Sequence, residues 1–362
     1  MKNFYNGSCE YFTIKQPSIA SGVTKKINNI VVSLNSIGVT TKLSIYNTSI
    51  KDLYYFIHGI IYSKSEIIII RFPGVIRAVL LAPFIQFKKF KGYKIVLDIP
   101  TPLIVTLQEI RHTNSIFGVI YRWIPIFLFY PWVLIPYSRI IQSGQEHPYF
   151  LFLIKNKTKL IGNGIDVESI KQVGYEKTDK NFLTMICVAQ LEIWHGYDRL
   201  LVGLSDYFKN NSDAVKGFQV FIVGDGNEKK NLMDLSKNLG LSNIVTFTGN
   251  LTGVELDAVF SKADMAVASL GSYRVNLKSS SPLKTREYAS RGLPFISADN
   301  DPDFQSDVPF VYKALNDCTS LDINSILSWY INLLDSGYDF KKIREYAEVN
   351  LDFKNKVKEM FL

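Results

Sequence analysis

The sequence predicts an α/β fold of two Rossmann-like domains, each a doubly wound parallel sheet. The 362 residues exceed what one hydrophobic core usually organises, so two domains are expected. Apolar runs rich in β-branched residues alternate with amphipathic helical patterns, which is typical of parallel α/β layers. This alternation stops at the turn-like segment 161–166 and then begins again.

Each half supplies strand and helix patterns in alternation. In the first half, strands are expected at 10–16, 39–46, 66–72 and 93–99, and helices at 24–36, 51–62 and 75–87. In the second half, strands are expected at 182–189, 218–224, 244–249 and 264–270, and helices at 197–208, 228–240 and 253–263. Amphipathic helices over 322–334 and 339–362 close the chain.

These patterns predict a domain over 1–163, a second domain over 164–340, and a terminal helix within 341–362 that returns to the first domain. Open parallel sheets bind ligands outside the carboxyl ends of their strands. We therefore expect the site in a central cleft that both domains face.

The composition is that of a globular protein inside the cell. With 47% apolar and 20% charged residues and no fixed repeat, neither half is disordered or low in complexity. Cys9, Cys187 and Cys318 are scattered and odd in number, which fits neither a disulfide framework nor a metal cluster and suggests a reducing compartment. No secretory signal is evident at the N-terminus, so a cytoplasmic protein is expected.

The charge is unevenly distributed along the chain. Up to Asp166 there are 19 Lys and Arg against 7 Asp and Glu, a balance of +12, and the remainder carries −4. A basic half can attract nucleic acid, anionic lipid or a phosphorylated substrate, and charge alone does not choose among them.

Two glycine-containing loops follow predicted strands. Gly22 opens the first helix, where free N–H groups let a phosphate or sugar approach, although such a glycine also serves a tight turn. Gly224 and Gly226 lack the third glycine of a dinucleotide fingerprint, so we do not expect a nicotinamide cofactor.

The segment SSSPLKTREYASRGLPFIS, residues 279–297, carries the strongest chemical pattern. A serine-rich loop leads into a helix with Lys284 in its first turn, and free N–H groups with this lysine suit a diphosphate. Glu287, one turn further, can accept both hydroxyls of a ribose. The alternative is a solvated charged helix, with Arg286 and Glu287 exposed.

This segment matches the pattern P-x-K-x-x-E-Y-x-x-x-G-x-P at Pro282, Lys284, Glu287, Tyr288, Gly292 and Pro294. It resembles the donor-site helix of glycosyltransferase family 4, whose members have the GT-B fold. The resemblance covers most of the chain, because IGNGID, WHGYDRLLVGL, FIVGDGNEKKNL, IVTFTGNL and ADMAVASLG follow in the family's order. It implies a retaining, metal-independent hexosyltransferase that uses a nucleotide-diphosphate sugar of the UDP or GDP type and holds no permanent cofactor.

The resemblance also implies residue roles. Glu287 would hold the donor ribose and Gly22 would face the diphosphate, but two basic residues of the family are replaced by Gln190 and His195. A protonated His195 and Arg199 are candidates to restore that charge, unless His195 only caps a helix and Arg199 is a surface charge. The full expected donor set is Gly22, Gln190, His195, Arg199, Gly226, Ser281, Leu283, Lys284 and Glu287. Because Ser279 stands where the family has a second glutamate, we expect serine hydroxyls to take part in sugar recognition.

On the acceptor side, Asp98, Thr101, Glu109 and His112 follow the fourth strand, where the family often keeps a histidine near the transferred sugar. We expect His112 and Glu287 to be catalytic and Thr101 and Glu109 to face the acceptor. A structural His112 is the alternative.

The motif Asp301-Pro302-Asp303 resembles the metal-binding D-x-D of another glycosyltransferase class. It follows a late strand and contains proline, so a solvated loop is expected instead, and no metal site. Helix N-termini and basic side chains can stabilise a leaving diphosphate without metal.

The segment 116–137 is apolar, with Arg122 as its single charge and with Trp123 and Trp132 among its aromatic residues. Its prolines are expected to break a spanning helix, so we predict an interfacial patch that docks on anionic lipid with a lysine cluster that includes Lys88 and Lys89. The alternative is that these residues fill the core.

These expectations combine into transfer of a sugar to a lipid-linked glycan at the inner face of a bacterial membrane, as in capsule, exopolysaccharide or O-antigen synthesis. Nucleic acid is not an expected partner. A non-catalytic nucleotide-sugar-binding subunit, or another GT-B enzyme such as an epimerase or a phosphorylase, stays open.

Overall fold

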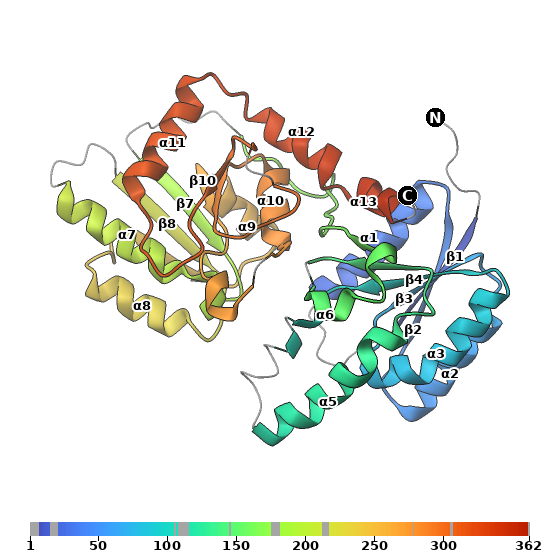
Figure 1. Ribbon diagram of the computed structural model, residues 1–362. Helices are drawn as coiled ribbons and strands as arrows, with labels where there is room; N and C mark the ends of the chain where they lie inside the picture. The colour runs from blue at the N-terminus through green and yellow to red at the C-terminus, as the bar shows by residue number, and fades with distance from the viewer. Residues whose placement is uncertain are drawn as a thin grey trace. The chain divides into compact units, whose positions relative to one another are not determined.

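The computed structural model describes residues 7–14, 21–104, 106–107, 116–144, 146–174, 182–211, 217–277, 279–304 and 307–360. The chain forms two compact units, Met1–Ile165 with Phe353–Leu362, and Asp166–Asp352. Each unit contains a parallel sheet flanked by helices (Figure 1). The predicted pair of doubly wound α/β domains is thereby confirmed.

The first unit has a sheet in the order β2-β1-β3-β4-β5-β6, with every neighbouring pair parallel. Its described strands are β1 (Ser8–Ile14), β2 (Thr40–Tyr46), β3 (Ile67–Arg71), β4 (Lys94–Ile99), β5 (Arg139–Gln142) and β6 (Thr158–Leu160). Its described helices are α1 (Ser21–Ser36), α2 (Ile50–Tyr62), α3 (Val75–Phe90), α5 (Ile116–Val133), α6 (Pro148–Leu151), the 3-10 turn η1 (Lys155–Lys157) and α13 (Phe353–Glu359). After β1, the next strand β2 lies on one side of it and β3 with the later strands lies on the other, so the switch point of the sheet lies between β1 and β3.

Alternate residues of each strand feed two hydrophobic cores, one on each face of this sheet. From β1, Phe12 packs into the core formed with α2, α3 and α5, and Tyr11 into the core that includes α1 and α13. α13 lies beside α1 (Figure 1). Of the predicted returning segment 341–362, this helix lies in the first unit, whereas α12 belongs to the second.

The second unit has a sheet in the order β12-β11-β10-β7-β8-β9, again all parallel. Its described strands are β7 (Phe182–Val188), β8 (Gly217–Val223), β9 (Val245–Gly249), β10 (Met265–Val267), β11 (Phe295–Ser297) and β12 (Val311–Lys313). Its described helices are η2 (Ile193–His195), α7 (Tyr197–Asn210), α8 (Lys229–Asn238), α9 (Gly253–Phe260), η3 (Ser272–Val275), α10 (Leu283–Arg291), α11 (Ile323–Asp335) and α12 (Lys341–Asn350). The switch point here lies between β7 and β10.

The helix α5 continues through Pro125 and Pro131, so the expectation that its prolines would break it is wrong. None of the helices in the described part of the chain is long and apolar enough to cross a membrane. One side of α5 packs into the core through Ile126 and Tyr130, whereas Leu128 and Trp132 are more than half exposed. The two alternatives for this segment, core and exposed patch, therefore each describe one side of the same helix.

Candidate functional site

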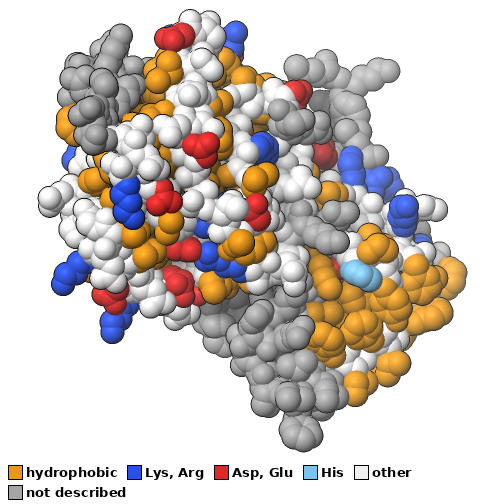
Figure 2. All heavy atoms as spheres, turned by 60° about the vertical axis from the view of Figure 1, so that its left-hand side comes forward, with side chains coloured by type: hydrophobic (Ala, Val, Ile, Leu, Met, Phe, Trp, Pro, Cys, Tyr) orange, Lys and Arg blue, Asp and Glu red, His pale blue; other side chains and the backbone are white. Residues whose placement is uncertain are grey.

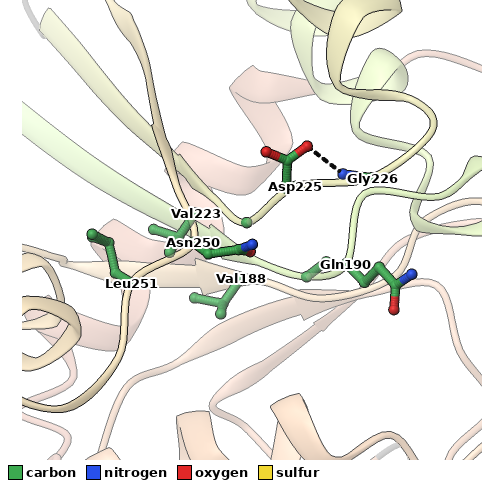
Figure 3. A pocket seen from close by; sticks show the side chains of 9 residues that line it. Val188, Gln190, Val223, Asp225, Gly226, Asn250 and Leu251 are labelled. Atoms are coloured by element: carbon green, nitrogen blue, oxygen red, sulfur yellow. Dashed lines mark hydrogen bonds between the residues drawn. The ribbon is translucent and has the colours of Figure 1, made fainter. Parts of the chain in front are cut away.

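A hollow opens at the carboxyl ends of β7, β8 and β9 in the second unit. Its volume is about 430 Å³, and it is lined by Val188, Ala189, Gln190, Val223, Gly224, Asp225, Gly226, Asn250 and Leu251. Figure 3 shows Asn250 beside Val188 and Val223, with Gln190 and Gly226 further along the same wall. Two residues of the predicted donor set, Gln190 and Gly226, thus share this hollow, whereas Asp225 and Asn250 were not predicted.

The wall of the hollow is built by two backbone segments in close contact. Leu191 N–H donates to the carbonyl oxygen of Asp225 at 2.8 Å, and Glu228 N–H donates to the carbonyl oxygen of Leu191 at 3.0 Å. Gly226 has a φ of +155°, and a Cβ there would lie 2.6 Å from Leu191 N. Glycine is therefore required because the loops after β7 and β8 approach each other at backbone distance.

Lys284, in the first turn of α10, is joined to the loop that follows β7. Its Nζ lies 2.9 Å from His195 Nδ1 and 3.3 Å from the hydroxyl of Tyr197. Burial lowers the pKa of Lys284 to about 8, although the nearby charge of Asp299 acts in the opposite direction. This lysine is therefore mostly protonated at neutral pH and donates to the imidazole.

His195 is neutral in this arrangement, and its protonation beside a bound diphosphate stays a prediction. Burial, and after it the adjacent charge of Lys284, lowers the pKa of His195 to about 2. A hydrogen bond to the backbone of Gln190 acts in the opposite direction and raises this pKa. With Nδ1 accepting from Lys284, the other ring nitrogen carries the proton for Gln190. The imidazole thus connects the lysine to a residue of the hollow.

Glu287 lies one turn beyond Lys284, and one of its carboxylate oxygens is fixed. Arg291 donates to Glu287 Oε1 through Nε at 3.0 Å and through a terminal nitrogen at 2.8 Å. Within the described residues, Oε2 makes no hydrogen bond, and the side chain is 24% exposed. The carboxylate is held in place and keeps one oxygen available for a hydroxyl group.

The helix that carries Glu287 is tied to the hollow by its next residue. The Tyr288 hydroxyl accepts from Val188 N–H at 3.1 Å, at the last residue of β7. α10 begins after Pro282, which provides no side-chain cap, so its first N–H groups lack partners from capping. The start of α10 therefore has backbone donors for the anion that the sequence led us to expect there.

The loop before α10 is less exposed than its composition suggests. Ser279 and Ser281 are buried, whereas Leu283 is 42% exposed. Behind the loop lies Asp299, which is 3% exposed and accepts from the Ser272 hydroxyl. Burial raises the pKa of Asp299 above its ordinary range.

Arg199, expected at the donor site or else as a surface charge, and Arg286, expected to be exposed, are both interior. Arg199 is 2% exposed and donates to the carbonyl oxygens of Thr319 and Leu270, so its hydrogen bonds hold the chain together and do not leave it free to reach a phosphate. Arg286 is fully buried and forms ion pairs with Asp301 and Asp303. The Asp-Pro-Asp motif is therefore part of a buried ion pair and not a solvated loop.

The remaining predicted site residues belong to the first unit. Gly22 lies in the first turn of α1, and Thr101 is exposed after β4. Glu109 and His112 lie outside the described residues, as does the side chain of Arg122.

The lysine cluster at the end of α3 is only partly a surface feature. Lys88 is 2% exposed and donates to the Ser63 carbonyl oxygen at 2.6 Å, which corrects its assignment to a membrane-facing patch. Lys89 is half-buried and Lys91 is exposed. Trp123 packs against the core, and Trp132 is 59% exposed.

Exposed apolar side chains gather on α3, on α5, and on and just after α6, and we call them the apolar face. They are Ile76, Leu80, Phe84, Phe87, Phe90, Ile124, Phe127, Leu128, Phe129, Trp132, Tyr149, Phe152 and Leu153. α5 packs between its neighbours, since it contacts both α3 and α6. Figure 2 shows hydrophobic side chains gathered over one side of the first unit. Such a patch marks an interaction surface.

The family model described as glycosyl transferases group 1 matches residues 167–305. The second unit contains a group 1 glycosyl transferase domain. The matched residues include the hollow and the whole of α10, and the match agrees with the family resemblance seen in the sequence. No curated protein matches the chain.

Solved structures share the GT-B fold over both units. The apo lipopolysaccharide outer core galactosyltransferase WaaB aligns with a TM-score of 0.58 and 14% identity, over 98% of this chain and 99% of that one. Sucrose-phosphate synthase from Thermosynechococcus elongatus aligns with a TM-score of 0.63 and 13% identity, over 98% and 97%. The pneumococcal O-GlcNAc transferase GtfA, solved with UDP and GlcNAc, aligns with a TM-score of 0.51 and 13% identity, over 85% and 58%.

Proposed function

We propose that this chain transfers a sugar from a nucleotide-diphosphate donor, with the nucleotide bound by the group 1 glycosyl transferase domain. The observation that carries the proposal is Glu287, whose Oε1 is held by Arg291 while Oε2 is open to a donor hydroxyl. In this arrangement Glu287 binds the ribose, and the diphosphate lies over the start of α10 near Lys284.

The chemistry of the leaving group fits this site. A departing nucleoside diphosphate needs stabilisation of negative charge, which backbone N–H groups and a lysine supply without a metal. The cation at Lys284, joined to His195, takes the place of the two basic residues that the resemblance would have put at Gln190 and His195. We propose UDP as the nucleotide, since GtfA was solved with UDP, and a retaining outcome, as the family resemblance implies.

We propose further that the acceptor is a lipid-linked glycan and that the first unit docks on an anionic membrane. The apolar face supplies aromatic and aliphatic side chains. Lys89 lies on α3, Lys91 follows α3 directly, and Lys155 begins η1, the next element after α6. Each basic residue near an anionic surface contributes about 1 kcal/mol, and the exposed aromatic side chains add burial at the interface. A bacterial polysaccharide pathway at the inner face of the membrane agrees with this surface.

Glu287 provides the test. Binding of UDP and of UDP-sugars is measured by calorimetry for the native chain, for Glu287→Gln and for Glu255→Gln, which changes an exposed carboxylate on α9. Glu287→Gln should weaken donor binding about tenfold, because a hydrogen bond to a charged group contributes about 1.5–3 kcal/mol. Arg291 keeps its bond to Asp257 at 2.7 Å, so the variant does not leave the guanidinium unpaired.

Transfer to a polyprenyl-linked acceptor is then assayed with the same proteins. Equal donor binding and transfer by the native chain and Glu287→Gln would refute the placement of the ribose. Nucleotide binding by the native chain without any transfer or hydrolysis of donor would instead support a non-catalytic partner subunit.

A further inference from the structure

A second hollow lies in the first unit, at the switch point of its sheet. It has a volume of about 460 Å³ and is lined by Thr13, Ile14, Arg71, Phe72, Pro73, Gly74, Arg77, Ile99, Pro100, Thr101, Leu103, Thr106 and Tyr130. These residues follow or end β1, β3 and β4 or begin α3, with Tyr130 contributed by α5. This is the position in which an open parallel sheet binds ligands.

The lining has the donors of an anion site. α3 begins after Gly74, with no side-chain cap and no acidic residue in its first turn, so the N–H groups of its first residues have no partner from a cap. Arg71 is balanced by Asp98 at 3.3 Å, and Asp98 also accepts from Tyr11 at 2.5 Å. Arg77 donates to the Pro73 carbonyl oxygen at 3.2 Å, and no carboxylate among the described residues pairs with it. Arg77 therefore adds a positive charge to the lining of this hollow, against the carboxylate of Glu146, which accepts from the backbone N–H of Leu103 at 2.5 Å.

Tyr130 is an independent observation that points to a ligand in this hollow. The residue is 1% exposed, it lines the hollow, and its hydroxyl has no hydrogen-bond partner among the described residues. Burial, followed by the nearby charge of Glu146, raises the pKa of Tyr130, so the hydroxyl keeps its proton. An unsatisfied buried hydroxyl is unfavourable, and a ligand oxygen next to it would remove that cost.

The polar hollow continues into an apolar one. The second space has a volume of about 420 Å³ and shares Phe72, Pro73, Gly74, Arg77, Leu103 and Thr106 with the first. It adds Val75, Ile76, Pro125 and Ile126, and of these Ile76 belongs to the apolar face. A path of apolar side chains thus leads from Arg77 toward the surface of α3 and α5.

We propose that these joined hollows bind the phosphate end of a long-chain anionic lipid. The phosphate oxygens accept from Arg77, from the first N–H groups of α3 and from the Tyr130 hydroxyl, and the first methylene groups of the chain lie between α3 and α5. This inference deepens the proposed function, on which it rests, because it places the phosphate of a lipid carrier in the first unit.

The test uses the full chain and dodecyl phosphate below its critical micelle concentration, titrated by calorimetry. Arg77→Gln should weaken binding about tenfold and Tyr130→Phe about threefold, as expected for loss of a charged and a neutral hydrogen bond. Lys64→Gln, which changes an exposed lysine outside the hollow, should leave the affinity unchanged. All variants should bind UDP like the native chain, because they do not alter the second unit.

Two further ligands decide the nature of the site. Inorganic phosphate and the uncharged dodecyl maltoside should each bind at least tenfold more weakly than dodecyl phosphate. Equal binding of inorganic phosphate would overturn the lipid part of the proposal, and equal binding of the maltoside, or no effect of Arg77→Gln, would overturn the anion part. If UDP does not bind while dodecyl phosphate does, the proposed donor function fails and the lipid site stands.

Discussion

The close approach of the loops after β7 and β8 predicts that Gly226→Ala disturbs both the stability of the second unit and its nucleotide hollow. The new Cβ would lie 2.6 Å from Leu191 N, and real Cβ contacts are longer than 3.0 Å. The loops must separate by several tenths of an ångström, at a cost of about 1–3 kcal/mol, typical of overpacking. For a unit of this size, 1 kcal/mol lowers the melting temperature by about 2–4 °C, so a decrease of about 2–12 °C is expected.

Gly240→Ala is the matched control. Gly240 also has a positive φ, of +73°, but a Cβ there meets no atom within 4 Å. Both variants bear the cost of a side chain at positive φ, and Gly226→Ala alone adds the collision. Melting curves with and without UDP should show a larger decrease and weaker UDP stabilisation for Gly226→Ala. Equal melting temperatures and equal UDP shifts for the two variants would refute the reasoning.

Three other measurements follow from the structure. Burial lowers the pKa of Lys284 to about 8, and the diphosphate favours the protonated lysine, so UDP affinity should fall about tenfold between pH 7 and pH 9. An affinity that does not change with pH, or the same pH dependence in Lys284→Met, would contradict this. Arg286→Met removes the guanidinium that pairs with the buried Asp301 and with Asp303, and it should cost about 3–5 kcal/mol, seen as a melting temperature about 6–20 °C lower. A loss below about 1 kcal/mol would argue against the buried ion pair. Co-sedimentation with vesicles that contain phosphatidylglycerol should weaken for Trp132→Ser and not for Trp194→Ser, which changes an exposed tryptophan of the second unit. If the native chain co-sediments equally with neutral vesicles, the anionic docking surface is excluded.

The strands and helices were predictable because each is long enough to show its own period. β7 begins at the expected Phe182, and α3 begins at the expected Val75 and extends three residues further. The helix continues past Pro83, which the pattern also predicted, because apolar residues keep the helical spacing on both sides of it. The periodic pattern of apolar residues within each element was therefore sufficient to predict the architecture.

Burial of charged residues was not predictable from the same pattern. Lys88 and Arg286 read as surface residues, since charged side chains are seldom buried. Lys88 is buried because its ammonium group donates to the Ser63 carbonyl oxygen and lies over the ring of Tyr93. Arg286 is buried because its guanidinium forms ion pairs with Asp301 and Asp303, from a loop about 15 residues further along the chain. These partners are brought together by tertiary structure and leave no periodic signal in the sequence.

The candidate site was predicted only in part, because some of its residues are close in sequence and others are brought together by tertiary structure. Lys284 and Glu287 lie one turn apart on a single helix, so their spacing was visible in the sequence. The neutral state of His195 was not, because it depends on burial and on the charge of Lys284, which is 89 residues away in the chain. Asn250 follows β9 and lines the hollow, and its position after a strand end was the signal that could have identified it.

The return of α13 to the first unit affects how that unit is made during translation. Phe353, Val357 and Met360 belong to the same core as Tyr11 and Ile30, and Phe353 N–H donates to the Ile165 carbonyl oxygen at 3.0 Å. While the ribosome synthesises the second unit, the core between the sheet and α1 therefore lacks part of its apolar lining. A nascent chain released before residue 353 would expose this surface, and we expect it to depend on chaperones until the last helix has been synthesised.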